Sequence, residues 1–139
     1  MITRYNPADL DEIEVQPMQT VERITPEHAI ALQCNEAFTA RSDDGEILIC
    51  AGALELWEGR ALCWALLSAH AGPHMLEITR AVKRYLRIAP FHRLEVYVDS
   101  CFGPALRWAH MLGFQLETPQ PMRGFLARDR NAYMFSRVR

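Results

Sequence analysis

Apolar and polar positions along the chain follow two periods, which predicts a mixture of strands and helices. Alternating or continuous apolar runs predict strands over Ile2–Tyr5, Ala37–Arg41, Glu46–Trp57, Ala61–Ser68, Arg93–Asp99, Phe114–Glu117 and Ala132–Val138. Capping residues and three- to four-residue spacing predict helices over Ala8–Ile13, Ala29–Cys34, His74–Arg87 and Ala105–Leu112. The stretch Gln16–Gln19 is ambiguous. This order of elements predicts an α/β (α+β) fold, with a mixed central β-sheet flanked by helices and one or two right-handed crossovers.

Some elements carry more detailed expectations. Ala61–Ser68 is apolar almost throughout, so we expect it in the middle of the sheet with both faces covered. The clean alternation of Arg93–Asp99 predicts that Leu94, Val96 and Val98 point inward. The polar stretch Thr118–Asn131 reads as a linker between the last two strands.

Composition is that of one globular domain spanning residues 1–139. Half of the residues are hydrophobic and 23% are charged, and no run is long and apolar enough to predict a membrane span. The four cysteines form no CxxC pair, which favours reduced thiols and a cytoplasmic location.

A net charge of −2 conceals an uneven distribution. Through Gly59 there are twelve Asp and Glu residues against three Arg, and from Arg60 onward five acids against twelve Arg and Lys. The basic half either attracts a phosphate-bearing ligand, a nucleic acid or an acidic protein surface, or is the solvated face of helices. With no nucleic-acid-binding motif, we do not expect a nucleic acid partner.

The stretch Leu94–Phe114, LEVYVDSCFGPALRWAHMLGF, is a strand, a sharp break and a helix that ends in Leu-Gly-Phe. It resembles the cofactor-binding half of the GNAT N-acetyltransferases. The opening Ile2-Thr3-Arg4 and the PADLDE stretch that begins at Pro7 also look like that superfamily's first strand and helix. The resemblance implies a single GNAT-like domain with acetyl-CoA or CoA as its cofactor, bound where the fourth and fifth strands diverge.

The same resemblance implies where the cofactor binds. The superfamily's pyrophosphate loop, Q/R-x-x-G-x-G/A, aligns with residues 69–74, which retain only Gly72 of its glycines, while Pro73 removes one backbone donor. The cofactor-binding residues implied are Leu67, Ser68, Ala69, Ala71, Gly72, His74 and Phe102. In this reading the N–H groups near Leu67 and Ser68 polarise the acetyl carbonyl.

The usual acid of the superfamily is missing. The tyrosine that protonates the departing thiolate corresponds to Ala109, and an asparagine that often meets the cofactor corresponds to Phe102. The nearest substitutes are Ser100 and Cys101, followed by Tyr97. Cys101 reads either as an activated thiol or as inert packing, and His110 is either an acid or base near the thiol or a surface histidine. His70 and His74 are four residues apart, but no third ligand stands out, so we expect no metal site.

A narrower resemblance joins ALCWALLS, VYVD, RWAHMLGF and ARDRNAYMFSR to small GNAT-like proteins of short-tailed bacteriophages and prophages. Two functional hypotheses follow. The first is acetyl transfer from acetyl-CoA to a small-molecule or protein amine. The second is a non-catalytic protein, cytoplasmic or virion-associated, that acts in virion assembly or protein–protein interaction with a phage or virion protein partner. Neither involves a membrane.

Overall fold

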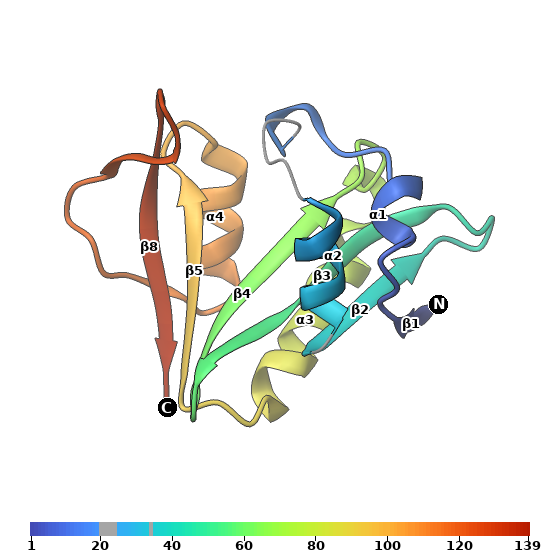
Figure 1. The fold of residues 1–139 in the computed structure, drawn as a ribbon, viewed down its shortest axis with the longest axis horizontal. Coiled ribbons are helices and arrows are strands. Elements are labelled where there is room, and N and C mark those ends of the chain that lie inside the picture. The colour runs from blue at the N-terminus through green and yellow to red at the C-terminus, as the bar shows by residue number, and fades with distance from the viewer. Residues whose placement is uncertain (20–24, 34) are drawn as a thin grey trace. The chain divides into compact units, whose positions relative to one another are not determined.

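The computed structural model describes residues 1–19, 25–33 and 35–139, and within them the chain forms two compact units (Figure 1). The first unit comprises residues 1–54 and 63–87, and the second comprises residues 55–62 and 88–139. None of the helices in the described part of the chain is both long enough and apolar enough to cross a membrane.

The first unit contains four neighbouring strands in the hydrogen-bonded order β1-β2-β3-β4. These are β1 (Ile2–Arg4), β2 (Glu36–Arg41), β3 (Ile47–Trp57) and β4 (Arg60–Leu67), of which β3 and β4 continue into the second unit. Its helices are α1 (Asp9–Glu12), α2 (Pro26–Gln33) and α3 (Met75–Ile88), with short 3-10 turns at Pro17–Gln19 and Gly72–His74. β1–β2 and β2–β3 pair antiparallel. Thr25 caps α2 as predicted, since its Oγ1 accepts from the His28 N–H at 3.2 Å.

Helices cover both faces of this four-stranded sheet. Phe38 of β2 lies against Tyr85 of α3, with ring centroids 5.7 Å apart. Successive residues of a strand point to opposite faces, so Ala37 and Thr39 point away from α3. On that side the Tyr5 hydroxyl donates to the Ala29 carbonyl of α2 at 3.0 Å. The sheet is therefore sandwiched between α3 and the N-terminal helices.

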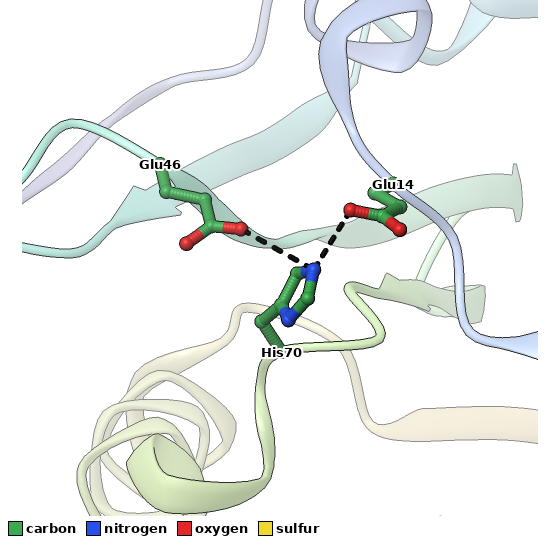
Figure 2. A group of neighbouring side chains, drawn as sticks. All are labelled: Glu14, Glu46 and His70. Atoms are coloured by element: carbon green, nitrogen blue, oxygen red, sulfur yellow. Dashed lines mark hydrogen bonds and ion pairs between the residues drawn. The ribbon is translucent and has the colours of Figure 1, made fainter.

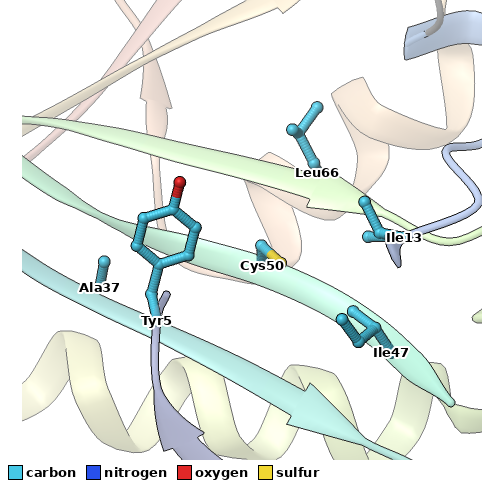
Figure 3. Packing of buried hydrophobic residues seen from close by; sticks show 6 residues of the cluster. All are labelled: Tyr5, Ile13, Ala37, Ile47, Cys50 and Leu66. Carbon is cyan, nitrogen blue, oxygen red and sulfur yellow. The ribbon is translucent and has the colours of Figure 1, made fainter. Parts of the chain in front are cut away.

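The core of the first unit lies on the face of the sheet opposite α3, where the N-terminal helices pack (Figure 3). It is formed by Tyr5, Ile13, Ala37, Ile47, Cys50 and Leu66. Each large apolar side chain of this kind contributes roughly 1.5–3 kcal/mol when buried. Burial raises the pKa of the Cys50 thiol to about 11, so the thiol stays protonated and unreactive.

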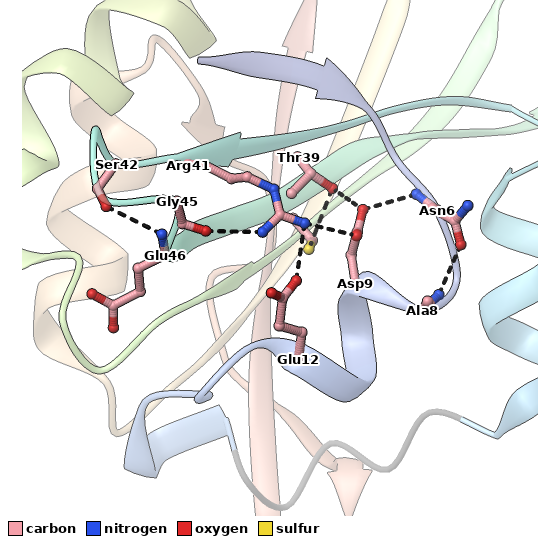
Figure 4. A network of polar contacts seen from close by, with 10 residues as sticks. Asn6, Ala8, Asp9, Glu12, Thr39, Arg41, Ser42, Gly45 and Glu46 are labelled. Carbon is pink, nitrogen blue, oxygen red and sulfur yellow. Dashed lines mark hydrogen bonds and ion pairs between the residues drawn. The ribbon is translucent and has the colours of Figure 1, made fainter.

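A polar network fixes α1 to the sheet (Figure 4). The Arg41 guanidinium donates to Asp9 at 3.2 Å, to Glu12 at 2.9 Å and to the Gly45 carbonyl at 3.0 Å. The buried Thr39 hydroxyl donates to Asp9 at 2.7 Å. These contacts hold together the end of β2, the turn at Gly45 and α1. They therefore determine where the residues that follow α1 begin.

The second unit is built around a long antiparallel pair. It contains β5 (Arg93–Asp99), α4 (Gly103–Met111), β6 (Gln115–Leu116), β7 (Met122–Ala127) and β8 (Arg130–Val138). β8 pairs antiparallel with β5, β6 and β7. β4 and β5 are parallel, but only Arg60–Leu62 pairs with residues 93–95. Gly113 ends α4 with φ +94°, the left-handed conformation predicted for a C-cap. The predicted α/β class with a mixed sheet is thus confirmed.

Three details of the sequence prediction are wrong, and one lies outside the described residues. Residues 118–131 contain β7 rather than only a linker, because Arg and Gly interrupt its apolar pattern. In β5, Glu95 and Asp99 are buried although they alternate with apolar residues, while Val96 is only half-buried. Four central residues of β4 are half-buried rather than covered on both faces. Cys34, the predicted end of α2, falls on an undescribed residue.

Buried Glu95 is neutralised by two arginines. Its side chain is 1% exposed and accepts from Arg60 at 2.5 Å and from Arg93 at 2.6 Å. Arg93 also pairs with Glu117 at 2.7 Å. The hydrogen bond from Arg60 is the largest cause that lowers the Glu95 pKa, and that from Arg93 lowers the Glu117 pKa to about 2. The buried carboxylate at the start of β5 is therefore fully paired with positive charge.

We expect Glu95→Gln to destabilise the protein by about 2–3 kcal/mol at pH 7. This is less than the roughly 3–5 kcal/mol of fully buried pairs, because both guanidiniums keep partial access to water. Both carboxylates have lowered pKa values in the folded state, so their stabilisation is complete above their usual pKa of 4.5. It is lost as the pH falls through the lowered values, which for Glu117 is about 2. Urea unfolding across that range measures both effects. Glu58→Gln, in an exposed turn, is the control, and an equal loss in both variants would contradict the role of Glu95.

Candidate functional site

The loop implied as the pyrophosphate site connects β4 to α3, and most of its backbone donors are already used inside the chain. Ser68 donates to the Leu48 carbonyl at 2.9 Å and Ala69 to the Glu14 carbonyl at 2.8 Å. His70 donates to the Ser68 hydroxyl at 3.0 Å. Ala71 and His74 donate within the loop, at 3.1 and 2.9 Å. These N–H groups therefore do not point at an external anion.

Gly72 is the exception. Its N–H has no acceptor among the described residues, and a Cβ added there would meet no atom within 4 Å. Pro73, which follows it, has no N–H to offer. A pyrophosphate needs several converging donors at a helix N-terminus. The loop offers one, so its donor set does not fit the pyrophosphate of acetyl-CoA.

The end of β4 is occupied by a second part of the chain, residues 14–19, which we call the edge segment. Ser68 donates to β3, and backbone groups of successive strand residues point to opposite edges. The N–H and C=O of Leu67 and the C=O of Ala65 therefore point to the edge of β4 opposite β3. The edge segment lies along that edge.

Gln19 satisfies these groups with its side chain. Its Oε1 accepts from the Leu67 N–H at 3.0 Å, and its Nε2 donates to the Ala65 carbonyl at 2.7 Å. Gln16 adds two contacts: its backbone N–H donates to the Leu67 carbonyl at 2.9 Å, and its Nε2 donates to Gln19 Oε1 at 2.8 Å. A side-chain amide thus binds β4 in the way that a neighbouring strand or an amide ligand would. The Leu67 N–H, expected to polarise an acetyl carbonyl, already has an acceptor.

Ser100 and Cys101, the predicted substitutes for the missing acid, lie in the turn between β5 and α4. Asp99 organises this turn, since its Oδ1 accepts from the Cys101 N–H at 2.8 Å and its carbonyl accepts from the Phe102 N–H at 3.1 Å. The hydroxyl of Ser100 and the thiol of Cys101 contact each other at 4.0 Å. No other hydrogen bond of either side chain occurs among the described residues, so neither side chain is hydrogen-bonded to a group that would exchange a proton with it, Asp99 included.

The remaining candidates of the second unit are engaged in packing. Ala109 is 4% exposed, so the position of the family tyrosine carries only a buried methyl group. The Tyr97 ring lies against Phe125, with centroids 4.6 Å apart. The exposed His110 packs edge-on against Phe135. None of these contacts places an acid beside Ser100 or Cys101.

A third group of polar side chains lies beside the loop. His70 meets Glu14 and Glu46 (Figure 2), whereas His74 lies outside this group. The hydrogen bond to Glu14 is the largest cause that raises the pKa of His70. Neither this group nor the edge segment was predicted, because their members are far apart in the sequence and glutamines in an aperiodic stretch carry no distinctive pattern.

Comparisons with known proteins identify the fold. No protein-family model and no curated protein sequence matches the chain. Among solved structures, Ard1 from Thermoplasma volcanium matches with a TM-score of 0.79 at 14% identity, over 99% of this chain and 96% of that one. Spermidine N-acetyltransferase from Vibrio cholerae, solved with CoA and spermine, matches with a TM-score of 0.73 at 11% identity, over 99% and 94%.

A GNAT superfamily phosphinothricin acetyltransferase from Sinorhizobium meliloti, solved with acetyl-CoA, matches with a TM-score of 0.71 at 15% identity, over 99% and 87% of the two chains. The chain therefore has the GNAT acetyltransferase fold, as its sequence predicts. At these identities the likeness concerns the fold and not the reaction.

We expect Gln19→Ala to expose the end of β4. Losing the acceptor should speed amide hydrogen exchange of Leu67 about fivefold, which corresponds to the ~1 kcal/mol of a net hydrogen bond. The Ser68 amide, bonded to β3, is an internal reference and should keep its rate. Gln115→Ala, an exposed glutamine of β6, is the control variant. Unchanged exchange at Leu67 would show that Gln19 does not hold this edge.

Proposed function

We propose that this GNAT-fold protein works by binding a protein partner and does not transfer acetyl groups from acetyl-CoA. The observation that carries the proposal is the pairing of Gln19 with both the N–H of Leu67 and the carbonyl of Ala65. The GNAT resemblance assigns the first of these groups, the Leu67 N–H, to the thioester end of the cofactor. In this chain both groups are satisfied without a ligand.

The rest of the candidate site supports the proposal. The loop from Ser68 to His74 keeps one unpaired N–H, at Gly72, where a pyrophosphate requires several. Ala109 supplies no acid, and the side chains of Ser100 and Cys101 contact only each other by hydrogen bonding. Protonation of a thiolate by a positioned acid is part of the reaction that the resemblance implies. The paired loop donors thus weaken cofactor binding, and the missing acid separately weakens proton transfer.

A binding function agrees with the charge of α3. Its exposed face carries Arg80, Lys83 and Arg84, and the acidic residues are concentrated in the first 59 residues. Such a basic face attracts acidic protein surfaces. The narrower proposal, that the partner is a phage or virion protein and the location cytoplasmic or virion-associated, rests on the sequence resemblance alone.

Isothermal titration calorimetry with acetyl-CoA tests the proposal. We expect no binding up to about 1 mM, the upper end of ordinary KM values, because the donors that would hold the cofactor are already paired. The spermidine N-acetyltransferase from Vibrio cholerae, which was solved with CoA, serves as the positive control. Micromolar binding, accompanied by the roughly 2.7 kcal/mol of stabilisation expected at 100 times Kd, would contradict the proposal.

One observation favours acetyl transfer to an amine as a second candidate. Gly72 has open space and an unpaired N–H just before the 14-residue helix α3, which suits an anion. If acetyl-CoA binds, Gly72→Glu should abolish that binding by placing a negative charge against the phosphates. In that case Gln19→Ala should strengthen binding by freeing the Leu67 N–H. This pattern would support an enzyme whose edge segment must first be displaced.

A further inference from the structure

Three metal-ligating side chains from separate parts of the sequence converge beside the edge segment. Glu14 begins that segment, Glu46 precedes β3, and His70 lies in the loop after β4 (Figure 2). Nε2 of His70 lies 2.7 Å from Oε2 of Glu14 and 3.8 Å from Oε1 of Glu46. All three ligand atoms lie within 4.8 Å of one another. We call these residues the Glu14–Glu46–His70 cluster.

The backbone holds the three positions in place. The carbonyl of Glu14 accepts from the Ala69 N–H at 2.8 Å, which ties it to the residue before His70. The N–H of His70 donates to the Ser68 hydroxyl at 3.0 Å. The carbonyl of Glu46 accepts from the Ser42 N–H at 2.9 Å, across the β2–β3 turn. The fold therefore fixes the three backbone positions from which these side chains converge.

We propose that this cluster binds a divalent transition-metal ion, with Zn²⁺ as the best match. Two carboxylates and a neutral imidazole carry a charge of −2, which a dication neutralises. Imidazole nitrogen and carboxylate oxygen are both Zn²⁺ ligands at about 2.0–2.2 Å. A tetrahedral ion with these ligands and one water needs them about 3.3–3.5 Å apart. Small side-chain rotations bring the cluster to that spacing.

The exposure of the side chains suits such a site. Those of Glu14, Glu46 and His70 are 71%, 50% and 53% exposed, so they can rotate and a water can complete the shell. In the absence of metal, Nε2 of His70 is hydrogen-bonded with Glu14, and Glu46 lies too far away for a hydrogen bond. The metal takes the place of the imidazole proton and draws in Glu46. It thereby clamps the start of the edge segment to the loop that leads into α3.

Calorimetric titration of the reduced protein with Zn²⁺ alone tests this proposal. We expect one equivalent to bind, with an affinity reduced at least about tenfold in His70→Ala and in Glu14→Gln, since changes to outer-shell partners alone cost metal sites 10–100-fold. His28→Ala and Glu77→Gln, exposed residues of the same types on α2 and α3, should bind as the unaltered protein does. Circular dichroism checks that each variant is folded.

Three results would overturn the proposal. The first is no binding up to about 1 mM Zn²⁺, and the second is unchanged binding in folded His70→Ala, which would assign the ion to another group such as the exposed Cys101 thiol. The third is equally tight binding of Mg²⁺, which prefers an all-oxygen shell and would exclude an imidazole ligand. The outcome does not depend on whether acetyl-CoA binds.

Discussion

The N–H and C=O groups of Leu67 and the C=O of Ala65, at the end of β4, must all find hydrogen-bond partners, and this requirement determines what can lie beside that strand. The last residues of a strand need hydrogen-bond partners for their buried N–H and C=O groups. Each buried group left unpaired lowers the stability of the fold by about 1–3 kcal/mol. Here Gln16 and Gln19 supply those partners from a segment about fifty residues earlier in the sequence. The same groups cannot serve a cofactor while these contacts persist.

The position of the edge segment follows from the N-terminal packing. Tyr5 and Ile13 anchor the chain on both sides of α1 in the core, and Arg41 holds Asp9 and Glu12 of that helix. Because both ends of α1 are fixed, the chain that follows it, residues 14–19, lies alongside the end of β4. The acetyltransferase fold is thus retained, while an internal contact occupies a position that the resemblance assigns to the cofactor.

Local signals explain how much of this could be predicted. The strands and helices followed from apolar periodicity, the start of α2 from Thr25 and the end of α4 from Gly113, because each is decided within a few residues. Buried Glu95 was not predicted, since its burial also depends on Arg60, which only the pairing of β4 with β5 brings beside it. β7 was missed because arginine and glycine interrupt its apolar pattern.

For the candidate site, the sequence predicted the position of the loop but not the contacts that its backbone makes. The loop after β4 was located from the sequence, and so was the loss of its glycines. The partners of its donors were not, because Gln19 and Glu14 reach it from a stretch without periodicity. Side chains that act across fifty residues leave no local trace, whereas the loss of a tyrosine at Ala109 is visible directly.

An ¹⁵N–¹H NMR titration with CoA tests whether the edge segment keeps the cofactor from β4, because it observes the Gln19 side-chain amide and the Leu67 and Gly72 backbone amides separately. We expect the Gln19 and Leu67 signals to keep their positions up to about 1 mM CoA, a concentration at the upper end of ordinary KM values. Saturable shifts of both signals at micromolar CoA, together with a shift at Gly72, would show instead that the cofactor displaces the edge segment.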